Sequence, residues 1–161
     1  MEWISPVSTA LGALIGVGST LLVDRFRWRR ERADRALENR KQLYADYSAA
    51  LSRIRTALNE CAHEGPEAEE RSRIVRELFL APGAYELRHQ LAILAPPEVV
   101  KASRAAFLVL RDTRDCLLAG ADAGSTSYRD LEDSFDNAVA ELREIMRRDL
   151  GAPHFISAQA G

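Results

Sequence analysis

WISPVSTALGALIGVGSTLLV, residues 3–23, contains no charged residue, and the arginine-dense segment DRFRWRRERADR follows directly at residues 24–35. At about 1.5 Å per residue, these 21 residues would form a helix about 30 Å long, the thickness of the hydrocarbon core of a bilayer. The sequence therefore predicts an N-terminal transmembrane helix over residues 3–23. Aromatic and arginine side chains are expected at its two membrane interfaces: Trp3, Arg25, Phe26, Arg27, Trp28, Arg29 and Arg30.

The distribution of charge predicts the orientation of this anchor. Residues 24–41 contain eight basic and four acidic side chains, whereas the chain from residue 42 onward carries 14 basic and 19 acidic ones. By the positive-inside rule the N-terminus lies outside the inner (plasma) membrane and the C-terminal domain is cytoplasmic. The alternative is a buried helix of a soluble protein, but an apolar helix of this length is hard to bury in a domain this small.

Small residues recur every four positions within the predicted span, at Ser8, Gly12, Gly16 and Thr20. They share one helical face, and Gly12 with Gly16 forms a GxxxG pair, which lets two helix backbones approach closely in lipid. This face is predicted to allow self-association. A monomeric anchor is the alternative.

The segment 25–63 is predicted to be one long helix, continuous with the span, because its apolar residues follow a heptad pattern. Arg40 interrupts that pattern, so tight packing is expected only after it. Gly65 and Pro66 should end the helix. We call the apolar stripe of this helix the bundle seam: Leu37, Tyr44, Tyr47, Leu51, Ile54 and Leu58.

Four further helical stretches are predicted from apolar periodicity and from glycine and proline breaks. Residues 67–80 and 84–94, the latter patterned by Tyr85, Leu87, Leu91 and Leu94, form either one kinked helix or two. A helix follows from Pro97 to about Ala119. The last begins at a capping box of Ser127 and Asp130 and ends before Gly151.

The predicted fold is thus all-α: an antiparallel bundle of about four helices, with no strand pattern. The domains are an anchor at 3–23, a cytoplasmic bundle at 24–150 and a flexible tail at 151–161. Cys61 and Cys116 fall within helical patterns, and reduced, buried thiols are expected rather than a disulfide.

Two Glu-x-x-His pairs, Glu60/His63 and Glu86/His89, match the two such motifs of di-iron bundles, which also need a carboxylate from each of two further helices. One pair lies opposite the bundle seam at a helix end, and the other directly follows a Pro-Gly break. No catalytic residue, metal site or cofactor is therefore predicted. Tyr44 and Tyr47 could instead line a ligand cleft within the bundle.

The basic segment 25–40, with Phe26 and Trp28, is typical of some nucleic-acid binders. Its place beside the membrane favours anionic lipid headgroups, and nucleic acid is not expected as a partner. With the anchor, the arginine cluster and the stretch RKQLYADY at 40–47, the chain resembles small actinobacterial single-pass membrane proteins, some labelled KilB-like. The likeness covers roughly residues 1–60 and implies an anchored helical body facing the cytoplasm.

The sequence predicts a non-enzymatic, membrane-anchored interaction or scaffold protein, whose bundle binds a protein partner or a second copy as a homo-oligomer. The alternative is a helical-bundle ligand sensor or metal-dependent enzyme with an internal cleft near the two tyrosines or the Glu-x-x-His pairs.

Overall fold

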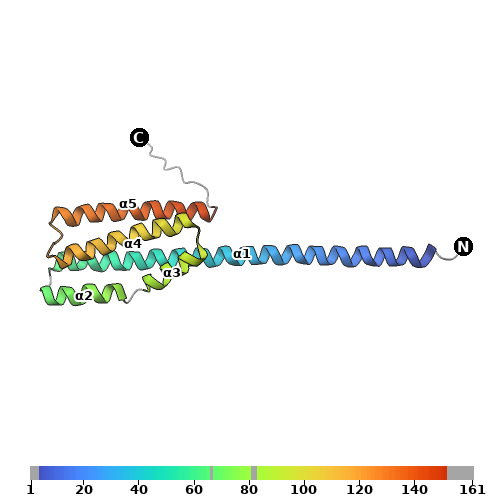
Figure 1. The fold of residues 1–161 in the computed structure, drawn as a ribbon, viewed down its shortest axis with the longest axis horizontal. Coiled ribbons are helices and arrows are strands. Elements are labelled where there is room, and N and C mark those ends of the chain that lie inside the picture. Colours follow the sequence, from blue (N-terminus) through green and yellow to red (C-terminus); the bar gives the residue numbers. More distant parts are fainter. Residues whose placement is uncertain (1–3, 66, 81–82, 152–161) are drawn as a thin grey trace, which may run out of the picture. The chain divides into compact units, whose positions relative to one another are not determined.

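The computed structural model describes residues 4–65, 67–80 and 83–151, with side chains from residue 28 onward apart from 79 and 80. Over these residues the chain is all-α, as predicted, with five helices and no strand. The helices are shown in Figure 1: α1 (Ile4–Glu64), α2 (Ala68–Leu80), α3 (Ala84–Leu94), α4 (Pro97–Leu118) and α5 (Thr126–Asp149).

The chain divides into two units, residues 1–39 and residues 40–161. Residues 4–39 belong to α1, which continues without a break into the second unit, as expected for one long helix. Within the described part of the chain, no helix has both the length and the apolar character that a bilayer span needs. The side chains of the predicted span at 3–23 lie outside the described residues.

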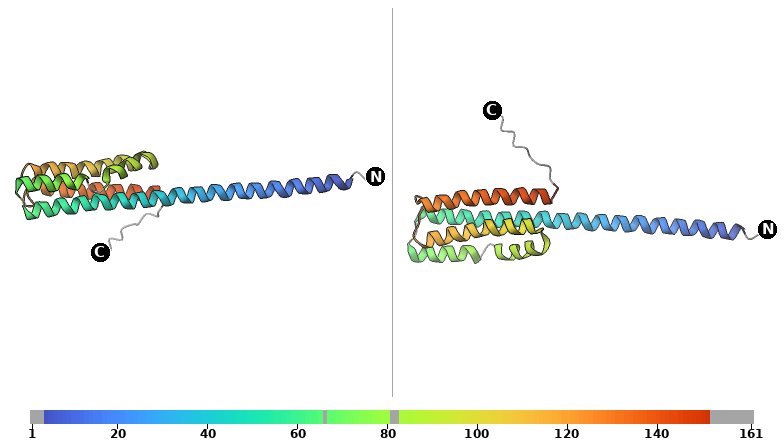
Figure 2. Two further views of the ribbon diagram at one scale, coloured as in Figure 1. Left: turned by 90° about the horizontal axis from the view of Figure 1, so that it is seen from below. Right: turned by 45° about the horizontal axis from the view of Figure 1, so that its top comes forward.

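The second unit is an antiparallel bundle. Helices α2 and α3 both run opposite to α1, α4 runs opposite to them, and α5 runs opposite to α4. Figures 1 and 2 show the C-terminal half of α1 beside α4 and α5, while α2 and α3 follow one another along one side of α4. The stretch between residues 66 and 95 is therefore two helices, which resolves the alternative that the sequence left open.

Local sequence explains where the helices end. Gly65 and Gly83 have φ angles of 57° and 64°, left-handed values that side-chain-bearing residues rarely adopt. Pro96 is extended and Pro97 takes the first turn of α4, where its missing N–H costs nothing. These breaks are encoded within a few residues, and the predicted helix ends lie within one or two residues of the observed ones.

The predicted start of the last helix is wrong by two residues, because the capping serine is Ser125 rather than Ser127. Helix α5 starts at Thr126, and the hydroxyl of Ser125, not of Ser127, accepts a hydrogen bond from the Tyr128 N–H at 3.3 Å. Ser125 also donates to the Asp122 carbonyl at 2.8 Å, and the loop thereby sets the cap.

The core lies between α1, α4 and α5, with α2 and α3 packed against it. Five of the six bundle-seam residues are at most 3% exposed, whereas Leu37 is half-buried and lies in the first unit. Ser103, Phe107, Leu110 and Leu117 are buried on α4, and Phe135 and Leu142 on α5. The periodicity of the long helix thus corresponds to a packed face from Leu43 onward.

Candidate functional site

One end of the bundle is held by a polar cluster that joins α1 to α5. The Tyr44 hydroxyl donates a 2.6 Å hydrogen bond to the Asp149 carboxylate. The Arg40 guanidinium donates to both oxygens of the same carboxylate at 3.2 Å. Burial and the neighbouring Asp149 carboxylate raise the pKa of Tyr44 well above its usual value, because both disfavour a second negative charge.

The second seam tyrosine is fixed in the middle of the bundle. Tyr47 is fully buried, and its hydroxyl donates to the Ser103 carbonyl on α4 at 2.9 Å. Burial raises the pKa of Tyr47 to about 12. Tyr128 on α5 donates in the same way to the Asn59 side-chain oxygen at 3.1 Å, and burial raises its pKa to about 12.

The hydrogen bonds of Tyr44 and Tyr47 disfavour a ligand cleft at these two residues. A ligand cleft needs polar groups that point into open space, but the hydroxyls of Tyr44 and Tyr47 each have a partner within the chain. Their hydrogen bonds join α1 to α5 and to α4. The two tyrosines therefore act as packing residues with satisfied hydroxyls.

The two Glu-x-x-His pairs lie far apart along the chain, on α1 and α3. His63 donates through Nδ1 to the Asn59 carbonyl at 2.9 Å and is exposed, as are Glu86 and His89. In the part of the chain that the structure describes, no group of three or more His, Cys, Asp or Glu side chains is placed to hold a metal ion. Cys61 is a buried free thiol, and Cys116 is a half-buried one.

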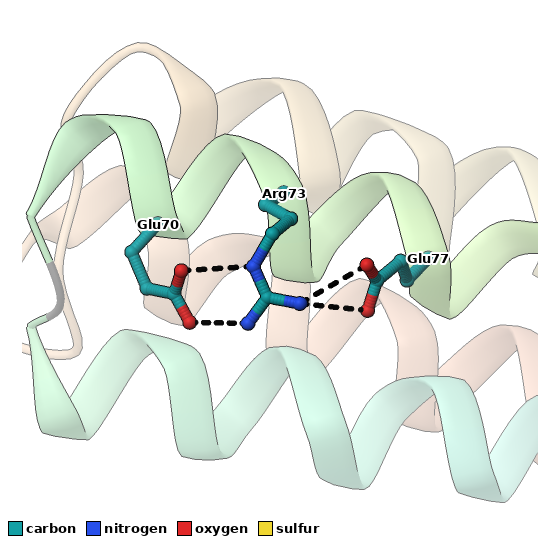
Figure 3. A network of polar contacts seen from close by, with 3 residues as sticks. All are labelled: Glu70, Arg73 and Glu77. Atoms are coloured by element: carbon teal, nitrogen blue, oxygen red, sulfur yellow. Dashed lines mark hydrogen bonds and ion pairs between the residues drawn. The ribbon is translucent and has the colours of Figure 1, made fainter.

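The outer surface of α2 carries a network of charged side chains, which Figure 3 shows from close by. The Arg73 guanidinium lies between the carboxylates of Glu70 and Glu77, bonding Glu70 at 2.9 Å and Glu77 at 3.0 Å. A surface hollow of about 700 Å³ runs along these residues. Its lining residues are all charged except Ser72, and the central charges already pair with one another, so no apolar or aromatic residue is present there to hold a small molecule.

The described part of the arginine-dense segment is a solvated helical surface. Trp28 is 63% exposed, and the Arg32 guanidinium lies over its ring at 5.7 Å from the centroid. Arg29, Arg30 and Arg35 are exposed as well. Side chains that lie outside the described residues include Trp3, Arg25, Phe26 and Arg27, together with the small-residue face at Ser8, Gly12, Gly16 and Thr20.

Helix α3 has the predicted bounds, but only part of its apolar pattern is buried. Its apolar pattern contained Tyr85, Leu87, Leu91 and Leu94, yet only Leu91 and Ala84 are buried. Tyr85 is exposed, Leu94 is 52% exposed, and Ile93 is 81% exposed. Tyr85 and Leu94 are nine residues apart, half a turn out of phase on a helix, so the two cannot face one core.

An aromatic–cationic cluster fixes the inner edge of α3. The Tyr85 ring meets the Phe107 ring edge-to-face, with centroids 5.1 Å apart. The Arg88 guanidinium lies 4.8 Å from the Phe107 centroid and 5.7 Å from that of Tyr85. Sequence reasoning missed this cluster because it depends on how α3 meets α4.

Comparisons of the chain with models of protein families, with curated proteins and with solved structures gave no match.

Proposed function

We propose that this chain is a single-pass membrane protein whose helical body binds a protein partner or a second copy of itself at the membrane. The observation that carries the proposal is the continuity of α1 from Ile4 to Glu64. One unbroken helix includes nearly all of the uncharged stretch at 3–23, the basic stretch at 24–41 and the buried bundle-seam residues from Tyr44 to Leu58. A helix satisfies its backbone hydrogen bonds internally, as a bilayer core requires.

The basic stretch supports the membrane-facing part of the proposal. The described arginines between residues 29 and 35 are exposed, and Arg35 lies 4.0 Å from Glu31, one helical turn before it. Juxtamembrane arginines of this kind bind anionic headgroups and keep their side of the membrane cytoplasmic. The exposed Trp28 ring suits the headgroup layer, where an amphipathic aromatic side chain is stable.

The role of such a protein is positional. The anchor holds the bundle at the inner membrane with the N-terminus outside, and the Gly12–Gly16 face allows two spans to pack closely. Binding through the bundle then takes place in the plane of the membrane. No reacting group or cofactor is part of this proposal.

Fractionation with protease accessibility tests the proposal. The full chain, with an epitope after residue 161, is expected in the membrane fraction after a carbonate wash. Its C-terminal epitope should resist protease in intact cells and be lost after lysis. A second chain in which Leu14 and Val17 are both replaced by Arg should leave the membrane, because each arginine at a span centre costs about 2.5–3.5 kcal/mol. Recovery of the unaltered chain in the soluble fraction would contradict the anchor.

A further inference from the structure

Helices α2 and α3 bury few residues for their length. They have 13 and 11 residues, whereas α5 alone has 24. Helix α5 contributes five buried residues to the core: Tyr128, Phe135, Val139, Leu142 and Met146. Among the described side chains, α2 and α3 together contribute Val75, Ala84 and Leu91. The burial that holds these two helices on the bundle is therefore much smaller than the burial that holds α5.

The packing of α2 and α3 against the bundle is also incomplete. Three large apolar side chains of α3 lie on its outside, since Tyr85, Ile93 and Leu94 are 38%, 81% and 52% exposed. Between α2 and α4 there is a surface hollow of about 270 Å³, lined in part by Val75 and Leu118. Apolar surface that stays in water contributes nothing to holding a helix in place.

The two helices join the rest of the bundle at residues that interrupt the helical backbone. Gly65 follows α1 with a φ angle of 57°, and Pro96 before α4 is extended. Figures 1 and 2 show α2 and α3 in line along one side of the bundle, between the end of α1 and the start of α4. They can therefore turn away without breaking the backbone hydrogen bonds within α1 or α4.

The other three helices are joined to one another without α2 and α3. Tyr47 on α1 donates to the Ser103 carbonyl on α4, and Tyr128 on α5 donates to Asn59 on α1. Most of the buried residues lie on these three helices. A core therefore remains when α2 and α3 detach.

Helices α2 and α3 cover side chains of α1 and α4. The Tyr85 ring packs edge-to-face on Phe107 of α4, with centroids 5.1 Å apart. On α2, Arg71 donates to the Leu117 carbonyl of α4 at 3.3 Å. Burial raises the pKa of the Cys61 thiol on α1, and Arg71 partly opposes this rise, so the guanidinium lies within electrostatic range of the thiol. Cys61 thus lies beneath α2, and Phe107 beneath α3.

We propose that α2 and α3 form a lid that opens as one unit about Gly65 and Pro96, while α1, α4 and α5 stay packed. Helices of 11 and 13 residues are barely stable alone in water, and neither buries enough to hold the other in place. One opening therefore releases both helices. The open molecule presents the Cys61 thiol and the apolar face around Phe107, which the closed lid hides.

The reaction of Cys61 with the thiol reagent DTNB tests the lid. In the full chain with Cys116→Ser, in detergent, the labelling rate should follow the fraction of molecules with an open lid. Leu91→Ala weakens α3, whereas Cys61 lies beneath α2. If both helices open together, this variant should raise the rate at least about tenfold. Leu142→Ala makes the same truncation at an equally buried position on α5 and should raise it by about twofold at most.

A second pair of variants leaves the buried residues unchanged. Tyr85→Ala removes the ring contact with Phe107 and should raise the labelling rate of Cys61 several-fold. Ile93→Ala, on the outer side of the same helix, should leave the rate unchanged. Circular dichroism of each variant verifies that the bundle is folded. The rate should also depend only weakly on urea, because lid opening exposes much less surface than unfolding does.

Three results would overturn the inference. Equal acceleration by Leu91→Ala and Leu142→Ala, or a urea dependence as steep as that of unfolding, would mean that the whole bundle must unfold to expose Cys61. A rate that neither Leu91→Ala nor Tyr85→Ala changes would mean that α3 does not move with α2. The measurement is made in detergent, so its outcome is independent of the anchor, which fractionation tests separately.

Discussion

The hydroxyl of Tyr44 and the carboxylate of Asp149 form a 2.6 Å hydrogen bond across 105 residues of sequence. Arg40, the first residue of the second unit, donates to the same carboxylate. Asp149 is the last residue of α5, so these hydrogen bonds join the start of the second unit to the end of α5. Asp149 lies at the negative end of its helix dipole, where an acid is unfavourable by itself. The two donors from α1 compensate for that position and close this end of the bundle.

A matched comparison measures the strength of this closure. Arg40–Asp149 and Arg55–Asp136 both join α1 to α5 at 3.2 Å, but the Asp149 side chain is 14% exposed and that of Asp136 is 60% exposed. Double-mutant cycles with alanine, measured by urea unfolding, should give a coupling energy of about 1–2 kcal/mol for the first pair. The solvated second pair should give at most about 0.5 kcal/mol. Equal coupling energies would show that the greater burial of the Arg40–Asp149 pair does not strengthen it.

Because the pKa values of two buried tyrosines are raised, we expect the protein to lose stability at alkaline pH. The pKa values of Tyr47 and Tyr128 are raised to about 12 by burial, from a usual value of about 10. The unfolded chain therefore releases these protons first. Stability is fully present below about pH 10 and falls as the pH rises toward 12, by up to about 1.4 kcal/mol per pH unit for each tyrosine.

Urea unfolding at about pH 9 and about pH 11, together with tyrosinate absorbance, measures this loss. Tyr47→Phe should cost about 1 kcal/mol at the lower pH, because it removes the hydrogen bond to the Ser103 carbonyl. The same variant should lose less stability on going to the higher pH. An identical pH dependence for both chains would mean that Tyr47 ionises as easily in the folded state as in the unfolded one.

Truncation to alanine should cost much more stability at one position on α3 than at another. Leu91 is fully buried, and Leu91→Ala should cost about 2–4 kcal/mol through lost burial and a cavity. Ile93 is 81% exposed, and Ile93→Ala should change the unfolding free energy by less than about 0.5 kcal/mol. Urea unfolding in dilute detergent solution, where copies are far apart, makes the comparison. A large cost at Ile93 would mean that it packs within its own chain.

The predicted small-residue face of the span has its own test. Gly12→Ile combined with Gly16→Ile should reduce crosslinking of the chain to itself in membranes, because the added side chains keep the two backbones apart. Leu11→Ile with Ile15→Leu conserves volume on the neighbouring face and serves as the control. Unchanged oligomers in the glycine variant would count against this face while leaving the anchor intact.

The helices could be predicted closely from the sequence because their ends are local. Gly65, Gly83 and the Pro96–Pro97 pair end or start helices through their own backbone preferences, which no distant contact alters. The buried face of α1 follows in the same way from its heptad spacing. The cap at Ser125 was missed because the loop before it, through the Asp122 carbonyl, decides which serine caps the helix.

The tertiary polar contacts could not be predicted. No sequence pattern near Asp149 indicates that Arg40 and Tyr44 will pair with it. Its place at a helix C-terminus, where an acid is unfavourable, gives no reason to expect a structural role. The exposure of Ile93 on α3 could not be predicted for a different reason. Its apolar residues are too many for one helical face, and only packing against α4 decides that Leu91 turns inward and Ile93 outward.

The shallow burial of α3 also has a kinetic consequence. Ala84 and Leu91 are its buried residues, so little apolar surface is exposed when it detaches, and the rest of the bundle keeps its core. Amide protons of α3 should therefore exchange with solvent through local opening, well before those of α4 and α5.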